Sequence, residues 1–223
     1  MAATEDWKLL ASGLHALELQ ASHEALEALL AYRDLLARWN RVHNLTAVRD
    51  PKAMIVHHLL DSLSINSFLH GQSLLDMGSG AGLPGVPLAL VNPKRCFTLL
   101  DANGKRVRFL RQVATEIGLE NVAIVHDRVE NFRPARFFDT IVSRAFASLG
   151  RFTSAAKPLL ESTGHILAMK GRMSEDEVAE VPPDLFVQKV HKLQVPGLEG
   201  ERHLIDLVFA PGGEAHSTKR FDE

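Results

Sequence analysis

The sequence of 223 residues contains one cysteine, Cys96, and this scarcity excludes two kinds of structure. A single thiol cannot form an internal disulfide, nor can it supply the several thiolates of a cysteine-based metal site. Cys96 begins an apolar, strand-like segment, so we expect a buried, unreactive thiol. A chain without disulfides is typical of the reducing cytoplasm, which is the predicted location.

Long hydrophobic runs are also missing. No stretch approaches the roughly 18 consecutive apolar residues that a membrane-spanning helix requires. The N-terminus carries Glu5, Asp6 and Lys8 where a signal peptide would be apolar. We therefore expect a soluble protein that is neither exported nor bound to a membrane.

The sequence has no excess of charge of either sign. Its 25 Lys and Arg residues nearly balance 27 Asp and Glu residues, with a formal net charge of −2 and a pI near 6.6. No global positive field would attract a polyanion, so any binding of nucleic acid must depend on a local basic patch.

The first third of the chain predicts a helical cap over residues 1–70. Ser22 can cap a helix that runs to about Asn40, and apolar residues recur along it at helical spacing. A second helix is expected to open at Asp50, with Pro51 at its first position, and to continue to a polar break near Asn66.

Residues 71–211 predict the main domain, because short apolar strands there alternate with helices. We expect strands at 73–77, 96–101, 121–126, 138–143 and 164–169. Helices should begin near Pro84, Asn103 and Ser148. This alternation is typical of an α/β fold whose mostly parallel sheet has helices on both faces.

The end of this domain differs, because residues 184–195 and 202–210 are two β-rich runs with no room between them for a crossover helix. Only antiparallel neighbours can be joined so briefly, so we predict a C-terminal antiparallel hairpin. Parallel strands followed by such a hairpin are the layout of the Rossmann-like class I S-adenosylmethionine (AdoMet) methyltransferase domain. Residues 212–223 are expected to form a flexible tail.

A glycine-rich loop follows the first predicted strand and is the most informative motif. The strand ends on Asp76, and Gly78, Gly80 and Gly82 follow at alternate positions. Glycines allow a tight turn and let a ligand approach backbone N–H groups. The dinucleotide fingerprint G-x-G-x-x-G fails, because Leu83 stands where its third glycine should be. The loop instead resembles an AdoMet-binding signature, in which the acid can face the cationic methionine end of the cofactor.

Polar residues follow the next three strands at the edge where open α/β sheets bind ligands. Asp101 lies at the distance along the chain where such folds place an acid against ribose hydroxyls, although it could equally cap the next helix. Val129 and Glu130 occupy the segment that commonly forms an adenine pocket, or else a plain charged loop. Arg144 follows Ser143 at the end of the fourth strand. It is expected either to face a cofactor or substrate or to form a local ion pair.

Two absences narrow the reaction. The Asp/Asn-Pro-Pro-aromatic motif associated with methylation of exocyclic amines is missing, since residues 143–146 read Ser-Arg-Ala-Phe. Methylation of pyrimidine carbon 5 requires a nucleophilic cysteine, and Cys96 lies at the wrong end of its strand. The remaining target is one that is already nucleophilic, such as guanine N7, which loses no proton before attack and needs only alignment.

Several short motifs in combination resemble the bacterial ribosomal small-subunit methyltransferase G family, also called glucose-inhibited division protein B. The resemblance covers roughly residues 35–210. The motifs are Asn44-Leu45-Thr46-Ala47, His58 with Asp61-Ser62-Leu63, Leu75 through Gly85, Lys105-Arg106 with Phe109-Leu110, Arg128-Val129-Glu130, Ser143-Arg144-Ala145 and Met169-Lys170-Gly171.

The resemblance implies an AdoMet-dependent enzyme that methylates N7 of one guanosine in the decoding-region loop of 16S rRNA. It implies cofactor contacts at Gly78, Leu83, Val129, Glu130 and Arg144, to which the reading of the loop and second strand adds Gly80 and Asp101. It indicates no catalytic side chain. The expected partner is 16S rRNA, with naked RNA and the assembled small subunit both open, and the protein is expected to be a monomer.

Two further groups of residues have open interpretations. Basic residues are expected on the helix after the second strand and at the carboxyl edge, where they could contact phosphates or simply form a solvated face: Lys105, Arg106, Arg108, Arg111, Arg144, Arg151, Lys170 and Arg172. His57 and Asp61 lie one helical turn apart beside His58, but without a third ligand in evidence we expect packing or capping rather than a metal site.

Three other functions compete with rRNA methylation. An AdoMet-dependent enzyme acting on a small molecule would suit the near-neutral charge. An NAD-dependent oxidoreductase is disfavoured by Leu83 and by the terminal hairpin. A nucleotide-sensing module would bind the cofactor and transfer nothing.

Overall fold

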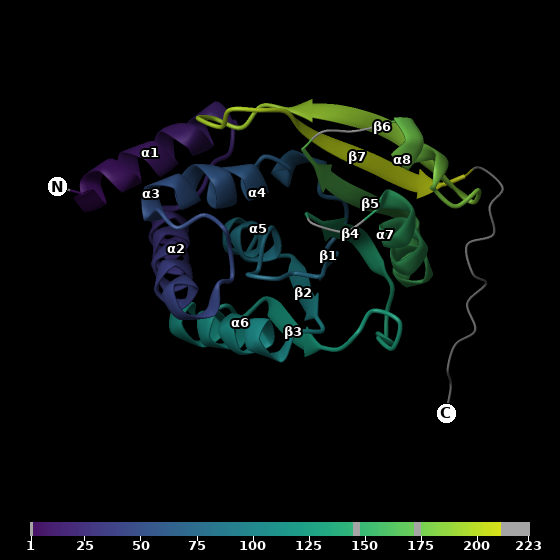
Figure 1. Cartoon of the computed structure of the whole chain (residues 1–223), viewed down its shortest axis with the longest axis horizontal. Coiled ribbons are helices and arrows are strands. Elements are labelled where there is room, and N and C mark those ends of the chain that lie inside the picture. Colours follow the sequence, from purple (N-terminus) through teal and green to yellow (C-terminus); the bar gives the residue numbers. More distant parts are fainter. Residues whose placement is uncertain (1, 145–147, 172–174, 211–223) are drawn as a thin grey trace.

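A seven-stranded sheet forms the centre of the computed structural model, which describes residues 2–144, 148–171 and 175–210 (Figure 1). The strand order is β3-β2-β1-β4-β5-β7-β6. The bounds are β1 Ser73–Met77, β2 Cys96–Asp101, β3 Val122–His126, β4 Phe138–Ser143, β5 Leu160–Lys170, β6 Leu185–Leu193 and β7 Arg202–Phe209. Strands β1 to β5 pair in parallel, and β7 pairs antiparallel with both β5 and β6. The predicted mixed sheet with a terminal hairpin is confirmed.

The strands form because apolar residues alternate between two buried faces. In β1, Leu74 packs into one hydrophobic cluster and Leu75 into the other, on the opposite face of the sheet. The predicted strand bounds agree with the structure to within one residue for β1 to β4. Strand β5 starts four residues earlier than predicted. Its pairing with β4 shifts register between two pairs, Phe138 with Leu160 and Thr140 with His165.

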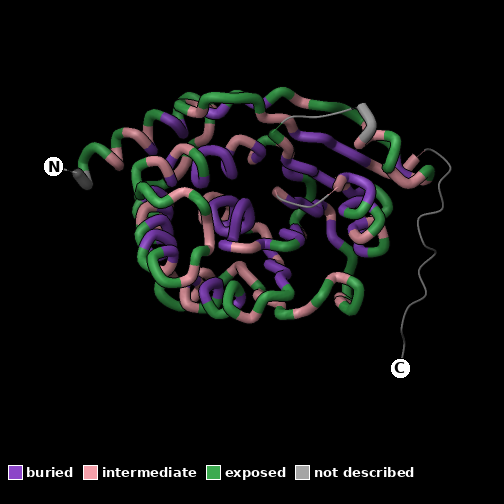
Figure 2. Tube along the Cα trace, viewed as in Figure 1, coloured by how far each residue is buried: buried purple, intermediate pink, exposed green. Residues whose placement is uncertain are grey.

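Helices cover both faces. On one face lie α1 Ala2–Ala16, α2 His23–His43, α3 Pro51–Met54, α4 Asp61–Leu63, α5 Gly85–Val91 and α6 Gly104–Ile117. On the other lie α7 Leu149–Ala156 and α8 Glu175–Ala179. Figure 2 shows the buried segments concentrated where helices meet the sheet. The cap and this face of the sheet share one continuous core cluster.

The helix starts follow from side-chain caps. The Ser22 side chain accepts a hydrogen bond from Ala25 N, and the Asp50 carboxylate accepts from the N–H groups of Lys52 and Ala53. Both predicted starts are confirmed. The sequence did not separate α1 from the rest of the cap, nor did it indicate the π-helical turn Ile55–Leu60 that lies between α3 and α4.

The expectation for Cys96 is wrong, because the structure exposes this residue. Cys96 is the first residue of β2, and the strand becomes continuously buried only from Leu99 onward. It therefore lies at the amino edge of the sheet.

Within the described residues, no helix combines the length and the apolarity that a membrane span requires. The domain boundary expected near residue 70 stays a prediction. The expected tail, residues 212–223, lies outside the described residues.

Candidate functional site

The glycine loop leaves β1 at the carboxyl edge, the edge at which all five parallel strands end. Gly78, Gly80 and Gly82 have φ values of +74°, +61° and +88°, which glycine adopts at little cost. The N–H groups of Gly78 and Ser79 both donate to the carbonyl of Leu100 in the neighbouring strand. The loop is therefore fastened to β2 rather than free.

Gly80 is the position where the loop leaves room for a ligand. A Cβ added there would meet only the carbonyl oxygen of Gly78, 3.9 Å away. By contrast, a Cβ at Gly82 would lie 2.6 Å from Val86 Cγ2, so that glycine is required for packing. The space beside Gly80 fits the expected cofactor cradle.

Asp76 lies beneath this loop and is 1% exposed. Its Oδ2 accepts a hydrogen bond from Gly85 N at 2.9 Å, while Oδ1 has no partner among the residues that the structure describes. Burial raises the pKa of the Asp76 carboxyl to about 7. A cationic group placed at Oδ1 would satisfy this oxygen, so the carboxylate suits the ammonium group of a methionine moiety.

Asp101 closes the other side of the loop. Its Oδ2 accepts from Gly80 N at 2.8 Å, and its Oδ1 accepts from Asn103 N at 2.7 Å. The side chain that caps α6 is that of Asn103, which accepts from Lys105 N and Arg106 N. Asn103, not Asp101, therefore caps α6. Asp101 lies at the carboxyl edge, where it accepts a hydrogen bond from the glycine loop.

The other predicted cofactor contacts differ in their exposure. Leu83 is 5% exposed, packs into the core cluster shared with the cap, and precedes Pro84 through a cis peptide bond. Val129 is half-buried in the turn after β3, where its carbonyl accepts from Phe132 N, and Glu130 is exposed. Contact of these residues with a cofactor stays a prediction.

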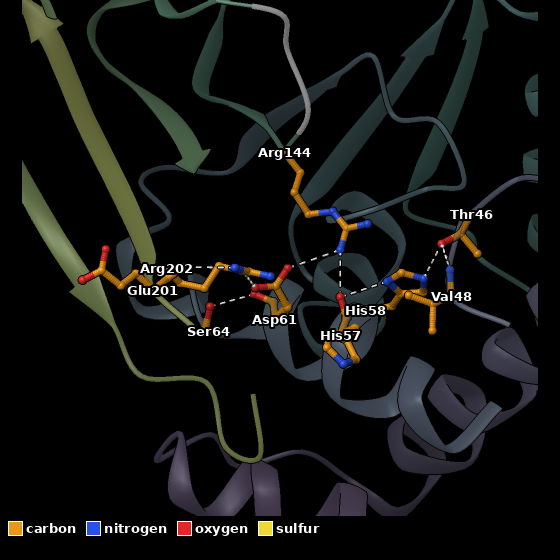
Figure 3. Close-up of polar contacts among 9 residues, drawn as sticks. All are labelled: Thr46, Val48, His57, His58, Asp61, Ser64, Arg144, Glu201 and Arg202. Atoms are coloured by element: carbon orange, nitrogen blue, oxygen red, sulfur yellow. Dashed lines mark hydrogen bonds and ion pairs between the residues drawn. The ribbon is translucent and has the colours of Figure 1, made fainter. Parts of the chain in front are cut away.

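Arg144 extends from the end of β4 toward the cap, not into open solvent (Figure 3). Its Nη1 donates to the His57 carbonyl at 3.1 Å and to Asp61 Oδ2 at 3.3 Å. Asp61 is 3% exposed, and its other oxygen, Oδ1, accepts from Arg202 Nε at 3.0 Å. One buried carboxylate therefore joins β4, β7 and the cap. The predicted local ion pair of Arg144 is present.

The π-helical turn explains how the cap reaches this network. Within this turn, the His57 carbonyl accepts from Arg144 and also lies 2.9 Å from His58 Nδ1. His58 Nε2 lies 2.8 Å from Thr46 Oγ1. Burial, with a smaller contribution from the Arg144 charge, lowers the pKa of His58 to about 4, so this imidazole is neutral at pH 7. The His57 side chain is exposed and only its carbonyl belongs to this network, whereas Asp61 bonds two arginines.

The basic residues predicted at the carboxyl edge do not form one cluster. Lys170 pairs with Glu177 at 2.7 Å, Arg151 is exposed on α7, and Arg172 lies outside the described residues. On α6, Lys105, Arg106, Arg108 and Arg111 are exposed. Sequence reasoning missed Arg202, although an antiparallel last strand must begin at the carboxyl edge and would have placed it there.

The structure brings together one group with metal-ligand side chains among its described residues, namely His70, His165 and Asp206. The two imidazole rings stack in parallel with centroids 3.4 Å apart, so their in-plane lone pairs do not converge on one point. His165 Nδ1 is already bonded to Asp206 Oδ1 at 2.8 Å. This arrangement does not suit a shared ion, and it lies toward the amino edge, away from the glycine loop.

Tyr32 connects the cap to the glycine loop, and its replacement tests that connection. Tyr32 is 0% exposed, and its hydroxyl donates to the Ala81 carbonyl at 2.7 Å. In Tyr32→Phe this carbonyl loses its buried partner, so we expect the free energy of unfolding to fall by about 1–3 kcal/mol in urea denaturation. The control is Ser12→Ala, which removes an exposed hydroxyl bonded to Leu9 O and should change stability by less than about 0.5 kcal/mol. Equal stabilities of the two variants would contradict this role.

Comparison with known proteins finds one family whose members are similar over most of the chain. The family model described as rRNA small subunit methyltransferase G matches residues 25–205. A protein of Methylococcus capsulatus named ribosomal RNA small subunit methyltransferase G is 49% identical over 199 residues, covering 89% of this chain and 97% of the relative. A protein of the same name from Alkalilimnicola ehrlichii is 50% identical over 196 residues, covering 88% of this chain and 89% of the relative.

Among solved structures, that of the mitomycin 7-O-methyltransferase MmcR superposes with a TM-score of 0.58 at 13% identity, covering 92% of this chain and 67% of that chain. At this identity the likeness shows the fold alone, a class I methyltransferase fold. The family model and the close relatives span both the cap and the sheet. The chain therefore belongs to the rRNA small subunit methyltransferase G family.

Proposed function

We propose that this protein transfers the methyl group of AdoMet to N7 of a guanosine in the decoding-region loop of 16S rRNA. The observation that carries the proposal is the match to the rRNA small subunit methyltransferase G family over residues 25–205. The site supports it independently, because the loop beside Gly80 has room for a ligand and is flanked by two buried carboxylates.

The residues that would hold AdoMet are those around the glycine loop. Asp76 Oδ1 would accept from the methionine ammonium group, and Asp101 would accept from the ribose hydroxyls. Gly78 and Gly80 would allow close approach, while Leu83, Val129, Glu130 and Arg144 complete the predicted contacts. The two carboxylates are already aligned by backbone N–H groups, so little reorganisation is needed on binding.

Bound AdoMet supplies an electrophilic methyl group on a sulfonium centre. Guanine N7 would accept this methyl group at its in-plane lone pair, and S-adenosylhomocysteine would be left as a neutral thioether. No proton leaves N7, so the protein needs only to align the two reactants. This requirement is consistent with a site in which His58, a buried histidine near Arg144, is held by Thr46 and the backbone.

The proposal also covers the setting of the reaction. The substrate is 16S rRNA, either free or within the small ribosomal subunit, so we place the reaction in the cytoplasm. We also propose that the protein acts as a monomer.

The pKa of Asp76 predicts how cofactor binding depends on pH. The ammonium group of the cofactor prefers the ionised carboxylate, and a pKa of about 7 in the free protein means that this form is depleted below neutral pH. Binding must then displace a proton, so affinity should fall as pH falls. We expect S-adenosylhomocysteine to bind about five- to tenfold more weakly at pH 6 than at pH 7.5 in calorimetry. Asp76→Asn should weaken binding at pH 7.5 and lose most of this dependence, whereas an unchanged pH profile in the variant would contradict the role.

The function is tested with 16S rRNA and small subunits from a bacterial strain lacking its own enzyme of this family. Purified protein and AdoMet labelled in the methyl group should introduce one label per RNA, and cleavage at 7-methylguanine should map it to the decoding-region loop. Labelling of metabolites without labelling of rRNA would favour the alternative of a small-molecule methyltransferase. Cofactor binding without any transfer would indicate a sensing module.

A further inference from the structure

Arg202 is a charged residue at the carboxyl edge that no step of the proposed methyl transfer uses. It is the first residue of β7, and the next residue, His203, pairs with Lys170 at the end of β5. Because β7 runs antiparallel to β5, its start lies where the parallel strands end. Arg202 Nη1 lies 3.7 Å from the position that a Cβ on Gly171 would occupy. The guanidinium group is therefore beside the proposed active site.

The cluster of Arg202, Asp61 and Arg144 carries a net positive charge. Asp61 supplies one negative charge to two guanidinium groups, at 3.0 Å from Arg202 Nε and 3.3 Å from Arg144 Nη1. His58, the next titratable group along the cap, is neutral at pH 7. The exposed Glu201 side chain points away from Asp61 in Figure 3, and no ion pair involves it among the described residues. One positive charge is left without a counter-ion in the described network.

The arginines keep donors available for a ligand. An arginine has five N–H donors in a rigid planar fork. Arg202 uses Nε for Asp61 and Nη1 for the Glu201 carbonyl, and no partner of its Nη2 lies within the described part of the chain. The side chains of Arg202 and Arg144 are 29% and 23% exposed, so solvent or a ligand reaches them. The bond to Asp61 fixes the orientation of the Arg202 fork in advance.

A fixed guanidinium group with free donors and an uncompensated charge matches the recognition of a phosphate. An RNA strand that presents a base at the carboxyl edge must bring its phosphates to the same edge. We propose that the cluster is a subsite for a backbone phosphate of the rRNA, in which Arg202 makes the contact and Asp61 is the positioning residue. This inference rests on the proposed function, because it assumes an RNA substrate.

The experiment compares Arg202→Gln, Arg202→Lys and a control, Arg136→Gln, in the full chain. Arg136 is an exposed arginine two residues before β4 begins, at the opposite edge of the sheet. The probe is a 16S rRNA fragment containing the decoding-region loop, with its affinity measured over a series of salt concentrations. Affinity for S-adenosylhomocysteine and thermal unfolding are measured for each variant.

We expect Arg202→Gln to bind the fragment about three- to tenfold more weakly and to reduce the slope of log K against log salt by about 0.7–0.9, as the loss of one phosphate contact predicts. Arg202→Lys should keep the wild-type slope because it keeps the charge. S-adenosylhomocysteine should bind equally to all variants, and Arg136→Gln should resemble the wild type.

An unchanged slope in folded Arg202→Gln, in a preparation whose wild type methylates rRNA, would overturn the subsite and leave the proposed function intact. Weaker S-adenosylhomocysteine binding with an unchanged RNA slope would also overturn it, since the arginine would then contact the cofactor carboxylate. A wild type that neither binds nor methylates rRNA would overturn both proposals. If Arg202→Gln unfolds, folded Arg202→Lys decides: the proposal requires that lysine keep the slope but bind the fragment more weakly than the wild type, because it lacks the planar fork. A wild-type affinity together with a wild-type slope in Arg202→Lys would overturn the subsite.

Discussion

Gly80→Val is expected to reduce the affinity for AdoMet by at least about a hundredfold, which corresponds to about 2.7 kcal/mol. The reason is steric. A Cβ at residue 80 would extend into the one part of the loop where only the Gly78 carbonyl, 3.9 Å away, is nearby. The two further methyl groups of valine would occupy the space in which the cofactor is proposed to lie. Calorimetric titration with AdoMet and with S-adenosylhomocysteine measures the effect.

A second cost must be separated from the first, because Gly80 has a φ of +61°. A β-branched residue in the left-handed region is strained by about 1–2 kcal/mol, which would lower stability whether or not a ligand binds nearby. Gly118→Val is the matched control, because Gly118 has a φ of +73° at the end of α6 and no atom within 4 Å of an added Cβ. Both variants should be destabilised to a similar extent, and only Gly80→Val should lose the cofactor. Retained affinity in folded Gly80→Val would remove the loop from the cofactor site.

Arg144→Ala is expected to lower the rate of methyl transfer by about ten- to a hundredfold while the protein stays folded. Loss of the guanidinium group removes the bonds to the His57 carbonyl and to Asp61, which join β4 to the cap. The substrate would then be aligned less well, and small errors of position have large effects on rate. Asp61 keeps its bond to Arg202 Nε, so the buried carboxylate is not left unpaired.

The partner that remains limits the loss of stability from Arg144→Ala to about 1–2 kcal/mol, well below the cost of a buried carboxylate with no partner. Steady-state transfer to rRNA and urea denaturation are the two measurements. Arg38→Ala is the control, since it removes an arginine from an exposed pair with Glu116, at 3.4 Å, and should alter neither quantity measurably. If Arg144→Ala kept the wild-type rate of methyl transfer, Arg144 would form a local ion pair and have no role in the reaction.

The elements that the sequence predicted correctly are those set by local rules. Ser22 and Asp50 cap their helices through short-range hydrogen bonds, and Pro51 fits only the first turn of a helix. The short connection between β6 and β7 requires an antiparallel pair. Each of these features depends on residues within a few positions of one another, so the pattern alone was sufficient.

The features that the sequence did not predict depend on contacts between distant segments. Asp61 and Arg202 are 141 positions apart, and nothing in either neighbourhood indicates that one carboxylate bonds two arginines. Tyr32 bonds a carbonyl 49 positions away. Cys96 is exposed as the first residue of β2, and the apolar pattern of the strand does not indicate where its buried part begins. Asp101 was placed correctly at the carboxyl edge, but its bond to Gly80 N is visible only in the fold.

The most direct test of the account is a crystal structure of the protein with S-adenosylhomocysteine bound at saturating concentration. The account predicts the ligand at the carboxyl edge, with its ammonium group at Asp76 Oδ1, its ribose hydroxyls at Asp101 and its backbone passing Gly80. Density for the ligand at any other place, or a glycine loop that remains empty at saturation, would contradict it.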